Sequence, residues 1–292
     1  MTLQALYDLP APAKLNLFLH VVGRRSDGYH LLQSVFLLID WMDTLHVELR
    51  RDGGLSRSDL SAELPADDLC LRAARALQAA SGCTLGAHIA IDKQVPWGAG
   101  LGGGSSDAAT TLLALNRLWG LNWPRRRLLE LGLRLGADVP FFLGGDNAWV
   151  EGVGERLTPL PWASRPYMLV KPPVAIPTQA IFSSPLLQRN TPPTTMAVFL
   201  ANTELFSKND LQAAAAAYSS EVGEALELLE RHVGPGRMSG SGSAVFAGAG
   251  VNPDATDVFE RSRQVLATLP SGWTGRLCRS LTAHPLKEWA ED

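Results

Sequence analysis

The chain is poor in cysteine, and its few cysteines form no recognisable motif. Its 292 residues include three cysteines, Cys70, Cys83 and Cys278, which are odd in number and widely spaced. Because no two of them form a C-x-x-C pair, the sequence indicates neither a disulfide framework nor a zinc site. This pattern favours a reducing compartment.

Long apolar runs and excess charge are also missing. No apolar stretch approaches the ~20 residues of a membrane span, and Asp8 precedes any sustained apolar run, unlike a signal peptide. The formal net charge is only −3, which indicates no general affinity for nucleic acid. We therefore expect a cytoplasmic protein with neither a nucleic-acid nor a membrane partner. The length of 292 residues and a hydrophobic fraction of 46% predict two domains of ordinary size.

The most informative stretch is a glycine-rich loop that leads directly into a predicted helix, from Val95 to Trp119. Apolar residues between 108 and 118 recur at helical spacing. We expect Ser105 and Ser106 to cap this helix and Gly120 to end it. Free backbone N–H groups at the positive end of a helix dipole bind phosphate, so the stretch predicts a phosphate site.

Two common phosphate loops do not fit this stretch. A Walker A loop needs a lysine after its glycines, and none is present. Gly98, Gly100 and Gly103 match the spacing G-x-G-x-x-G, but residues 93–96 separate them from the strand-like segment 88–92. The region 121–127 also lacks the acidic residue expected ~20 positions on in a dinucleotide fold. A flexible linker is disfavoured, because linkers rarely run straight into a long amphipathic helix.

Residues 11–19 alternate as a strand, which places Lys14 and Asn16 on one face and apolar residues on the other. By themselves these residues fit a cleft or a solvated edge equally well. A polar turn over 23–30 and an apolar run over 31–39 follow. Residues 40–47 then indicate a further turn and strand.

The segment Pro-x-Gly-x-Gly-Leu-Gly-Gly-Gly-Ser-Ser-Asp-Ala-Ala, which begins at Pro96, resembles the nucleotide loop of the GHMP kinases. Three other segments are similar to one family among them, the 4-diphosphocytidyl-2-C-methyl-D-erythritol kinases of the non-mevalonate isoprenoid pathway. These segments are Pro-Ala-Lys-Leu-Asn-Leu from Pro12, Asp-Gly-Tyr-His from Asp27, and Asp-x-x-Asp-Thr from Asp40. The resemblance extends from about Pro12 to Leu281.

The resemblance implies an α+β, two-domain GHMP kinase fold. Residues 1–163 would form an N-terminal domain like ribosomal protein S5 domain 2, which carries the ATP loop. Residues 164–292 would form a ferredoxin-like C-terminal domain, with the boundary in the proline-containing segment 159–166. A second glycine-rich loop, 234–246, resembles the third GHMP motif. We expect its residues Ser239, Gly240 and Ser241 to pack against the nucleotide loop and support the phosphate site.

The implied activity is ATP-dependent phosphorylation of the 2-hydroxyl of 4-diphosphocytidyl-2-C-methyl-D-erythritol, a small nucleotide-linked substrate. ATP is the expected co-substrate, with Mg²⁺, for which the sequence suggests no protein ligand. The residues expected to bind ATP are Lys93, Pro96, Trp97, Gly98, Ala99, Gly100, Leu101, Gly102, Gly103, Gly104, Ser105 and Ser106.

Lys14 and Asp138 correspond to the catalytic lysine and aspartate of the family. Asp138 lies in Gly-Ala-Asp-Val-Pro-Phe, a context that also suits a helix N-cap. In the catalytic interpretation, Asp138 accepts the proton of the substrate hydroxyl. Lys14 keeps that carboxylate ionised, since a nearby positive charge lowers a carboxyl pKa.

The resemblance assigns Asn16, Tyr29, His30 and Phe182 to the cytidine substrate. A tyrosine ring can stack on a pyrimidine, and a histidine can hydrogen-bond to the edge of a base. Without its tyrosine neighbour and the family match, His30 would be interpreted as an ordinary turn residue. The family phenylalanine that corresponds to Phe182 stacks on the cytosine.

Two positions depart from the family, which usually has asparagine where Asp68 and Asp107 stand. Asp68 either contributes near the adenine or only caps a helix. A carboxylate at position 107 would repel nearby phosphates. It must therefore point away, stabilise the helix dipole or meet a magnesium ion, and the sequence does not choose among these.

Three other functions fit parts of the pattern. One is a GHMP kinase for a small alcohol such as mevalonate or homoserine, which needs no aromatic residues to hold a base. Another is an ATP-consuming decarboxylase of the same fold. The third is a non-catalytic nucleotide-binding module, which the presence of both Lys14 and Asp138 disfavours.

Overall fold

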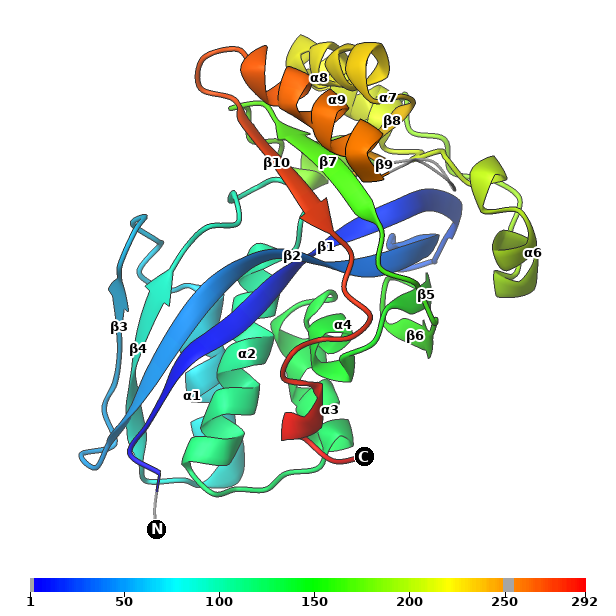
Figure 1. The fold of residues 1–292 in the computed structure, drawn as a ribbon. Coiled ribbons are helices and arrows are strands. Elements are labelled where there is room, and N and C mark those ends of the chain that lie inside the picture. The colour runs from blue at the N-terminus through cyan, green and yellow to red at the C-terminus, as the bar shows by residue number, and fades with distance from the viewer. Residues whose placement is uncertain (1–2, 249–254) are drawn as a thin grey trace.

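Two long antiparallel strands form the centre of the N-terminal half. The computed structural model describes residues 3–248 and 255–292. In it, β1 (Ala5–Arg24) pairs with β2 (His30–Arg50) along most of their length (Figure 1). The prediction of a turn near residue 40 is wrong. The chain stays extended there because residues 44–50 continue as the partner of β4 (Gly86–Asp92).

These strands belong to a six-stranded sheet with β3 (Leu55–Asp59), β5 (Ala148–Glu151) and β6 (Arg156–Pro159). Five of its strands are hydrogen-bonded in the order β3-β4-β2-β5-β6, and the sixth strand, β1, pairs with β2. Helices α1 (Leu69–Ser81), α2 (Gly103–Leu118), α3 (Arg125–Leu135) and α4 (Val139–Gly144) pack on one face of the sheet (Figure 1). Helix α2 is buried all round rather than on the one apolar face that the spacing of residues 108–118 predicted, since every residue from Ser106 to Asn116 is buried.

The C-terminal half contains a second sheet, made of β7 (Pro166–Lys171), β8 (Gly236–Met238), β9 (Val245–Gly248) and β10 (Thr274–Arg279). Its order is β10-β7-β9-β8, so the strands taken in chain order lie 4-1-3-2, as in a ferredoxin-like fold. Helices α7 (Gln212–Tyr218), α8 (Ser220–His232) and α9 (Ala255–Ala267) gather on one side of it (Figure 1). The predicted α+β fold is confirmed.

Short helices complete the chain. They are α5 (Thr178–Ser183), α6 (Met196–Ala201) and two 3₁₀ turns, η1 (Thr203–Leu205) and η2 (Lys287–Trp289). In Figure 1, α6 lies at the side of the molecule, and its Phe199 packs against Phe18 of β1 and Trp149 of β5. Among the residues that the structure describes, no helix combines the length and the apolar character needed to cross a bilayer.

The two halves share a hydrophobic core. Leu15 and Phe18 of β1 lie in one buried cluster with Phe199 of α6 and Phe246 of β9. The final segment also returns to the N-terminal half, since the Leu281 N–H donates to the Leu38 carbonyl at 2.8 Å. The division at residues 163/164 stays a prediction, and residues 280–292 lie against the domain before it.

Candidate active site

The glycine-rich loop reaches α2 one turn earlier than its serines suggested. Gly102 is the N-cap of α2, with φ +72°, and no side chain caps the helix. The prediction that Ser105 and Ser106 cap α2 is therefore wrong, because both lie inside the first turns. Gly120 takes φ +66° just after the helix, as expected of a terminating glycine. The start of α2 is thus lined by main chain alone.

The second glycine-rich loop packs directly against the first, as predicted. The Ser239 hydroxyl donates to the Gly100 carbonyl at 3.1 Å and accepts from the Asn16 N–H at 3.2 Å. The approach is so close that a Cβ on Gly100 would lie 2.2 Å from the Ser239 carbonyl oxygen. The contribution of Ser239, Gly240 and Ser241 to phosphate binding stays a prediction.

Lys14 and Asp138 meet beside this loop. The Lys14 Nζ lies 3.4 Å from Asp138 Oδ2, donates to Asn16 Oδ1 at 2.6 Å, and sits 4.3 Å from the centroid of the Phe36 ring. The lysine is only 4% exposed, whereas the Asp138 side chain is 32% exposed. Asp138 precedes α4, but its side chain makes no capping hydrogen bond. The carboxylate is therefore free to serve the cavity that it lines.

Gly102 brings the loop up to this pair. A Cβ on Gly102 would lie 3.1 Å from Lys14 Cγ, so only glycine lets the main chain come this close to the lysine. The Lys14 N–H also donates to the Leu101 carbonyl at 2.8 Å. The main chain that is predicted to bind phosphate and the lysine–aspartate pair are thus adjacent.

Three aromatic rings gather at the other end of the same cavity. Tyr29 is 65% exposed, and the rings of His30 and Phe182 lie with centroids 5.0 Å apart at 30°. The Arg189 Nε donates to His30 Nε2 at 3.2 Å. Burial lowers the pKa of His30, and the positive charges of Arg189 and Arg24 lower it further. His30 is therefore held as a neutral imidazole.

One cavity of about 1060 Å³ joins these two ends. Its volume is at the upper end for small-molecule sites, which leaves room for two nucleotide-sized ligands to meet. The predicted site residues that line it are Lys14, Asn16, Tyr29, His30, Gly98, Gly100, Gly102, Asp138, Phe182, Gly240 and Ser241.

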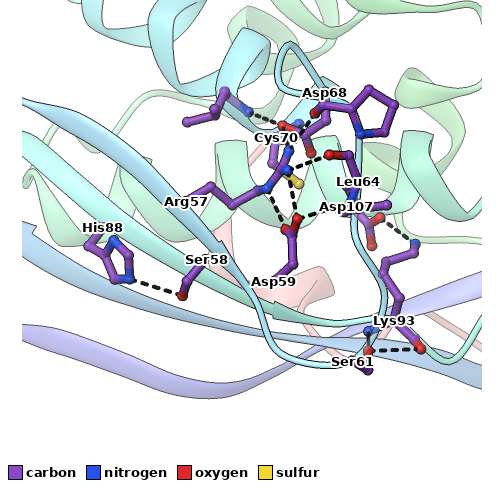
Figure 2. A network of polar contacts seen from close by, with 12 residues as sticks. Arg57, Ser58, Asp59, Ser61, Leu64, Asp68, Cys70, His88, Lys93 and Asp107 are labelled. Atoms are coloured by element: carbon purple, nitrogen blue, oxygen red, sulfur yellow. Dashed lines mark hydrogen bonds and ion pairs between the residues drawn. The ribbon is translucent and has the colours of Figure 1, made fainter.

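Lys93 lies outside this cavity, in a buried ion-pair cluster at the entry to the loop. Its Nζ contacts Asp43 Oδ2 and Asp107 Oδ2, the latter at 2.6 Å, and Figure 2 shows Lys93 extended toward Asp107. Burial raises the pKa of Asp107, a shift that the charge of Lys93 only partly offsets. The Asp107 side chain is thus directed at Lys93, and the other roles left open for it stay predictions.

The remaining loop residues do not line the cavity either. Trp97 is 72% exposed, while Ala99 and Leu101 are buried in the shared core. Gly103, Gly104, Ser105 and Ser106 form the first turn of α2, and the buried Ser106 hydroxyl has no hydrogen-bond partner in the described structure. The ATP contacts expected of all these loop residues, and of Lys93 and Pro96, stay predictions.

Asp68 is a helix cap. Its carboxylate accepts from the Cys70 and Leu71 N–H groups at 3.2 and 3.1 Å. It also pairs with Arg57 at 2.7 Å, and Arg57 holds Asp59 on its other side, as Figure 2 shows. The capping interpretation of Asp68 is confirmed, and a further contribution near the adenine remains untested.

The structure adds residues that the sequence argument overlooked. Asp43 accepts from the Gln94 and Val95 N–H groups at 2.6 and 2.8 Å and so anchors the start of the loop. Arg24 and Arg189 line the same cavity as His30 and Phe182. Asp43 stands in the Asp-x-x-Asp-Thr segment, so a signal was present, but nothing in the local pattern identified its partners.

No metal site is built from side chains in the part of the chain that the structure describes. Within residues 3–248 and 255–292, no three histidine, cysteine, aspartate or glutamate side chains gather closely enough to hold a metal ion.

Comparison with known proteins agrees with this geometry. The GHMP kinases N terminal domain matches residues 68–146, and the GHMP kinases C terminal domain matches residues 195–261. The 4-diphosphocytidyl-2-C-methyl-D-erythritol kinase of Methylibium petroleiphilum is 67% identical over 290 residues, which cover 99% of this chain and all of that protein. This chain belongs to the 4-diphosphocytidyl-2-C-methyl-D-erythritol kinase family.

Solved structures support membership of this kinase family. A crystal structure of 4-(cytidine 5'-diphospho)-2C-methyl-D-erythritol kinase matches with a TM-score of 0.77 and 34% identity, over 93% of this chain and 98% of that one. A homoserine kinase from Cytophaga hutchinsonii matches with a TM-score of 0.71 at 17% identity, over 97% of this chain and 96% of that one. At that identity the second match shows a common fold alone.

Proposed function

We propose that this enzyme transfers the γ-phosphoryl group of ATP to the 2-hydroxyl of 4-diphosphocytidyl-2-C-methyl-D-erythritol. The observation that carries the proposal is a single cavity with a lysine–aspartate pair at one end and three aromatic rings at the other. The pair suits proton and phosphoryl transfer, and the rings suit a pyrimidine. Membership of the kinase family supports the same assignment.

At the phosphate end, Asp138 is the proposed general base and Lys14 its partner. The 3.4 Å separation lets the lysine stabilise the aspartate as a carboxylate, which can then accept the hydroxyl proton. The lysine also counters the negative charge that develops during transfer. The Asn16 amide oxygen, 2.6 Å from Nζ, holds the lysine in place.

The loop from Val95 to Ser106 is the proposed site for the ATP phosphates. The positive-φ glycines Gly98, Gly100 and Gly102 leave the main chain open along the cavity wall, and the N-terminus of α2 follows at once. Helix N-termini favour anions through their free N–H groups and dipole. Mg²⁺ is proposed to accompany ATP and to neutralise the phosphates. No protein ligand is assigned to it.

At the base end, Tyr29, His30 and Phe182 are proposed to hold the cytosine. The 65% exposure of Tyr29 leaves a ring face open for a ligand. His30 supplies a polar edge, and Phe182 supplies a second ring. A kinase for a small alcohol has no use for this arrangement, so the base end disfavours mevalonate and homoserine as substrates.

The assignment is tested by offering the purified protein γ-labelled ATP with the cytidine substrate, mevalonate or homoserine in separate reactions. We expect label transfer to the cytidine substrate alone. Transfer to mevalonate or homoserine instead would replace the proposal with another GHMP kinase activity. Release of carbon dioxide would indicate a decarboxylase, and no ATP turnover with any of them would indicate a binding module.

A cytoplasmic location is also proposed. All three cysteines are free in the structure, and Cys70 and Cys278 are buried, which suits a reducing compartment. Fractionation of cells that express the tagged chain would test this. Recovery of the enzyme in an oxidising compartment would contradict it.

A further inference from the structure

Arg189 joins the two halves of the base end. Its Nε donates to His30 Nε2, on the first residue of β2. Its Nη2 donates to the Phe182 and Ser184 carbonyls, both at 3.0 Å, and its Nη1 donates to the Leu187 carbonyl at 3.1 Å. One guanidinium group thus fixes the histidine and the backbone of the phenylalanine that faces it.

The contact with His30 constrains the proton on the imidazole. A guanidinium group only donates hydrogen bonds, so the nitrogen that it contacts must accept. A neutral imidazole has one accepting and one donating nitrogen, and the hydrogen bond at one nitrogen sets the role of the other. Since Nε2 accepts from Arg189, the ring proton lies on Nδ1.

The surroundings of His30 favour this neutral state. Burial lowers its pKa, and the charges of Arg189 and Arg24 act in the same direction. Phe182 lies against the imidazole, with ring centroids 5.0 Å apart. No protein hydrogen bond to Nδ1 occurs within the described ranges 3–248 and 255–292. The Nδ1–H group is thus the ring donor left for a ligand.

We propose that Arg189 is a positioning residue that selects the Nδ1–H tautomer of His30 and so presents a fixed hydrogen-bond donor to the pyrimidine ring. The inference rests on the proposed function, in which the base end holds cytosine. The ring N3 of cytosine accepts a hydrogen bond, whereas the ring N3 of uracil carries a hydrogen and donates. A fixed donor opposite that edge favours cytidine over uridine, because the wrong base leaves polar groups unpaired.

The tautomer is measured directly by two-bond ¹⁵N–¹H correlation spectra of the ligand-free protein labelled at histidine. His30 is assigned as the signal that disappears in His30→Ala. We expect the wild-type signal to show a protonated Nδ1 and a bare Nε2. In Arg189→Met, which keeps side-chain length but removes every donor, the proton should move toward Nε2. A wild-type spectrum with a protonated Nε2 would overturn the proposal.

Kinetics with the two nucleotide substrates supply the second readout. We expect Arg189→Met to raise KM for the cytidine substrate about tenfold and to reduce the preference over the uridine analogue by a similar factor. KM for ATP should stay within about twofold. Arg165→Met is the matched control, a half-buried arginine whose guanidinium lies over Trp162. It should change neither constant.

A double-mutant cycle separates positioning from simple loosening of the loop. If Arg189 acts through His30, Arg189→Met should add little to the effect of His30→Ala. Fully additive effects of the two substitutions would contradict the proposal. Arg189→Lys, which keeps a single cationic donor, should recover part of the cytidine preference and serves as the test variant if Arg189→Met fails to fold. Failure of the proposed function would look different, because the wild-type enzyme would not phosphorylate the cytidine substrate while the spectra would remain interpretable.

Discussion

The phosphate end and the base end of the cavity are built in opposite ways. At the phosphate end, Lys14 is 4% exposed and held by Asn16 and Asp138, and the loop contributes main chain. At the base end, Tyr29 is 65% exposed and His30 and Phe182 are half-buried side chains. Charge stabilisation needs groups that are fixed before the reaction begins. In the proposed function, stacking is completed only when the base covers the rings, which agrees with the exposure of Tyr29 in this structure.

Asp138→Asn should give the largest effect and tests the phosphate end directly. The amide cannot accept the hydroxyl proton, so we expect turnover to fall by about 10²–10⁴, with ATP binding retained. Steady-state kinetics and ATP titration measure both. The matched control is Asp146→Asn, because the Asp146 side chain is 33% exposed and pairs with Lys287 at 2.9 Å. Turnover of Asp138→Asn near the wild-type value would remove Asp138 from the mechanism.

Gly100→Ala should damage the contact between the two glycine-rich loops. Its φ of +74° disfavours a side chain, and the new Cβ would lie 2.2 Å from the Ser239 carbonyl oxygen. We expect a loss of about 2–4 kcal/mol in the free energy of unfolding, together with weaker ATP binding.

Gly120→Ala is the control for Gly100→Ala. It has a similar φ of +66°, but a Cβ there would meet nothing within 4 Å. Its cost should be only about 1 kcal/mol, from backbone strain alone. Equal denaturant midpoints for the two variants would mean that the loop contact contributes nothing.

Tyr29→Ala tests the base end and should leave stability nearly unchanged, because the ring is 65% exposed. Loss of stacking should raise KM for the cytidine substrate by roughly ten- to a hundredfold and leave KM for ATP unaltered. Tyr218→Ala removes another exposed ring, at the end of α7, and should alter neither. A rise in KM for ATP instead would contradict the assignment of Tyr29 to the base end of the cavity.

Asp107→Asn should have the smallest effect, seen in the pH dependence of stability. The folded pKa of Asp107 lies above its unfolded value, chiefly because of burial. Between those two values the folded protein binds more protons than the unfolded chain, so Asp107 makes stability fall as pH rises. The asparagine removes this loss. The variant should therefore gain stability over the wild type as the pH rises.

Urea unfolding of Asp107→Asn at several pH values measures this gain. Glu63→Gln, which changes an exposed acid, should run parallel to the wild type. If Asp107→Asn is instead less stable by the same amount at every pH, Asp107 is an ionised partner of Lys93 throughout.

The secondary structure was largely predictable because its signals are local. The alternation around Lys14 and Asn16 predicted a strand with both on one face, and their 2.6 Å contact confirms it. The glycine after α2 was placed correctly, since a left-handed terminus selects glycine. The capping serines were placed wrongly, because Gly102 turns the chain into the helix before either serine is reached.

Partners across long stretches of sequence were not predictable in this way. The resemblance placed Lys93 among the residues expected to bind ATP, and the structure shows it buried between Asp43 and Asp107. The sequence argument overlooked Arg189, because its contact with His30 crosses from one half of the fold to the other. Ion pairs of this kind depend on how distant elements pack.

The amino-acid sequence by itself determined most of the elements and the kind of loop, because glycine positions, strand alternation and helical spacing are properties of neighbouring residues. The kinase family was indicated by the resemblance of its motifs. Only the tertiary structure decided which charges meet. Lys14 and Asp138 lie far apart in the chain, and the packing of both β1 and α4 against α2 brings the Lys14 Nζ to 3.4 Å from Asp138 Oδ2. The tertiary structure also places Lys93 between two carboxylates, whereas Asp138 lines the cavity. This difference depends on burial and distance rather than on residue type.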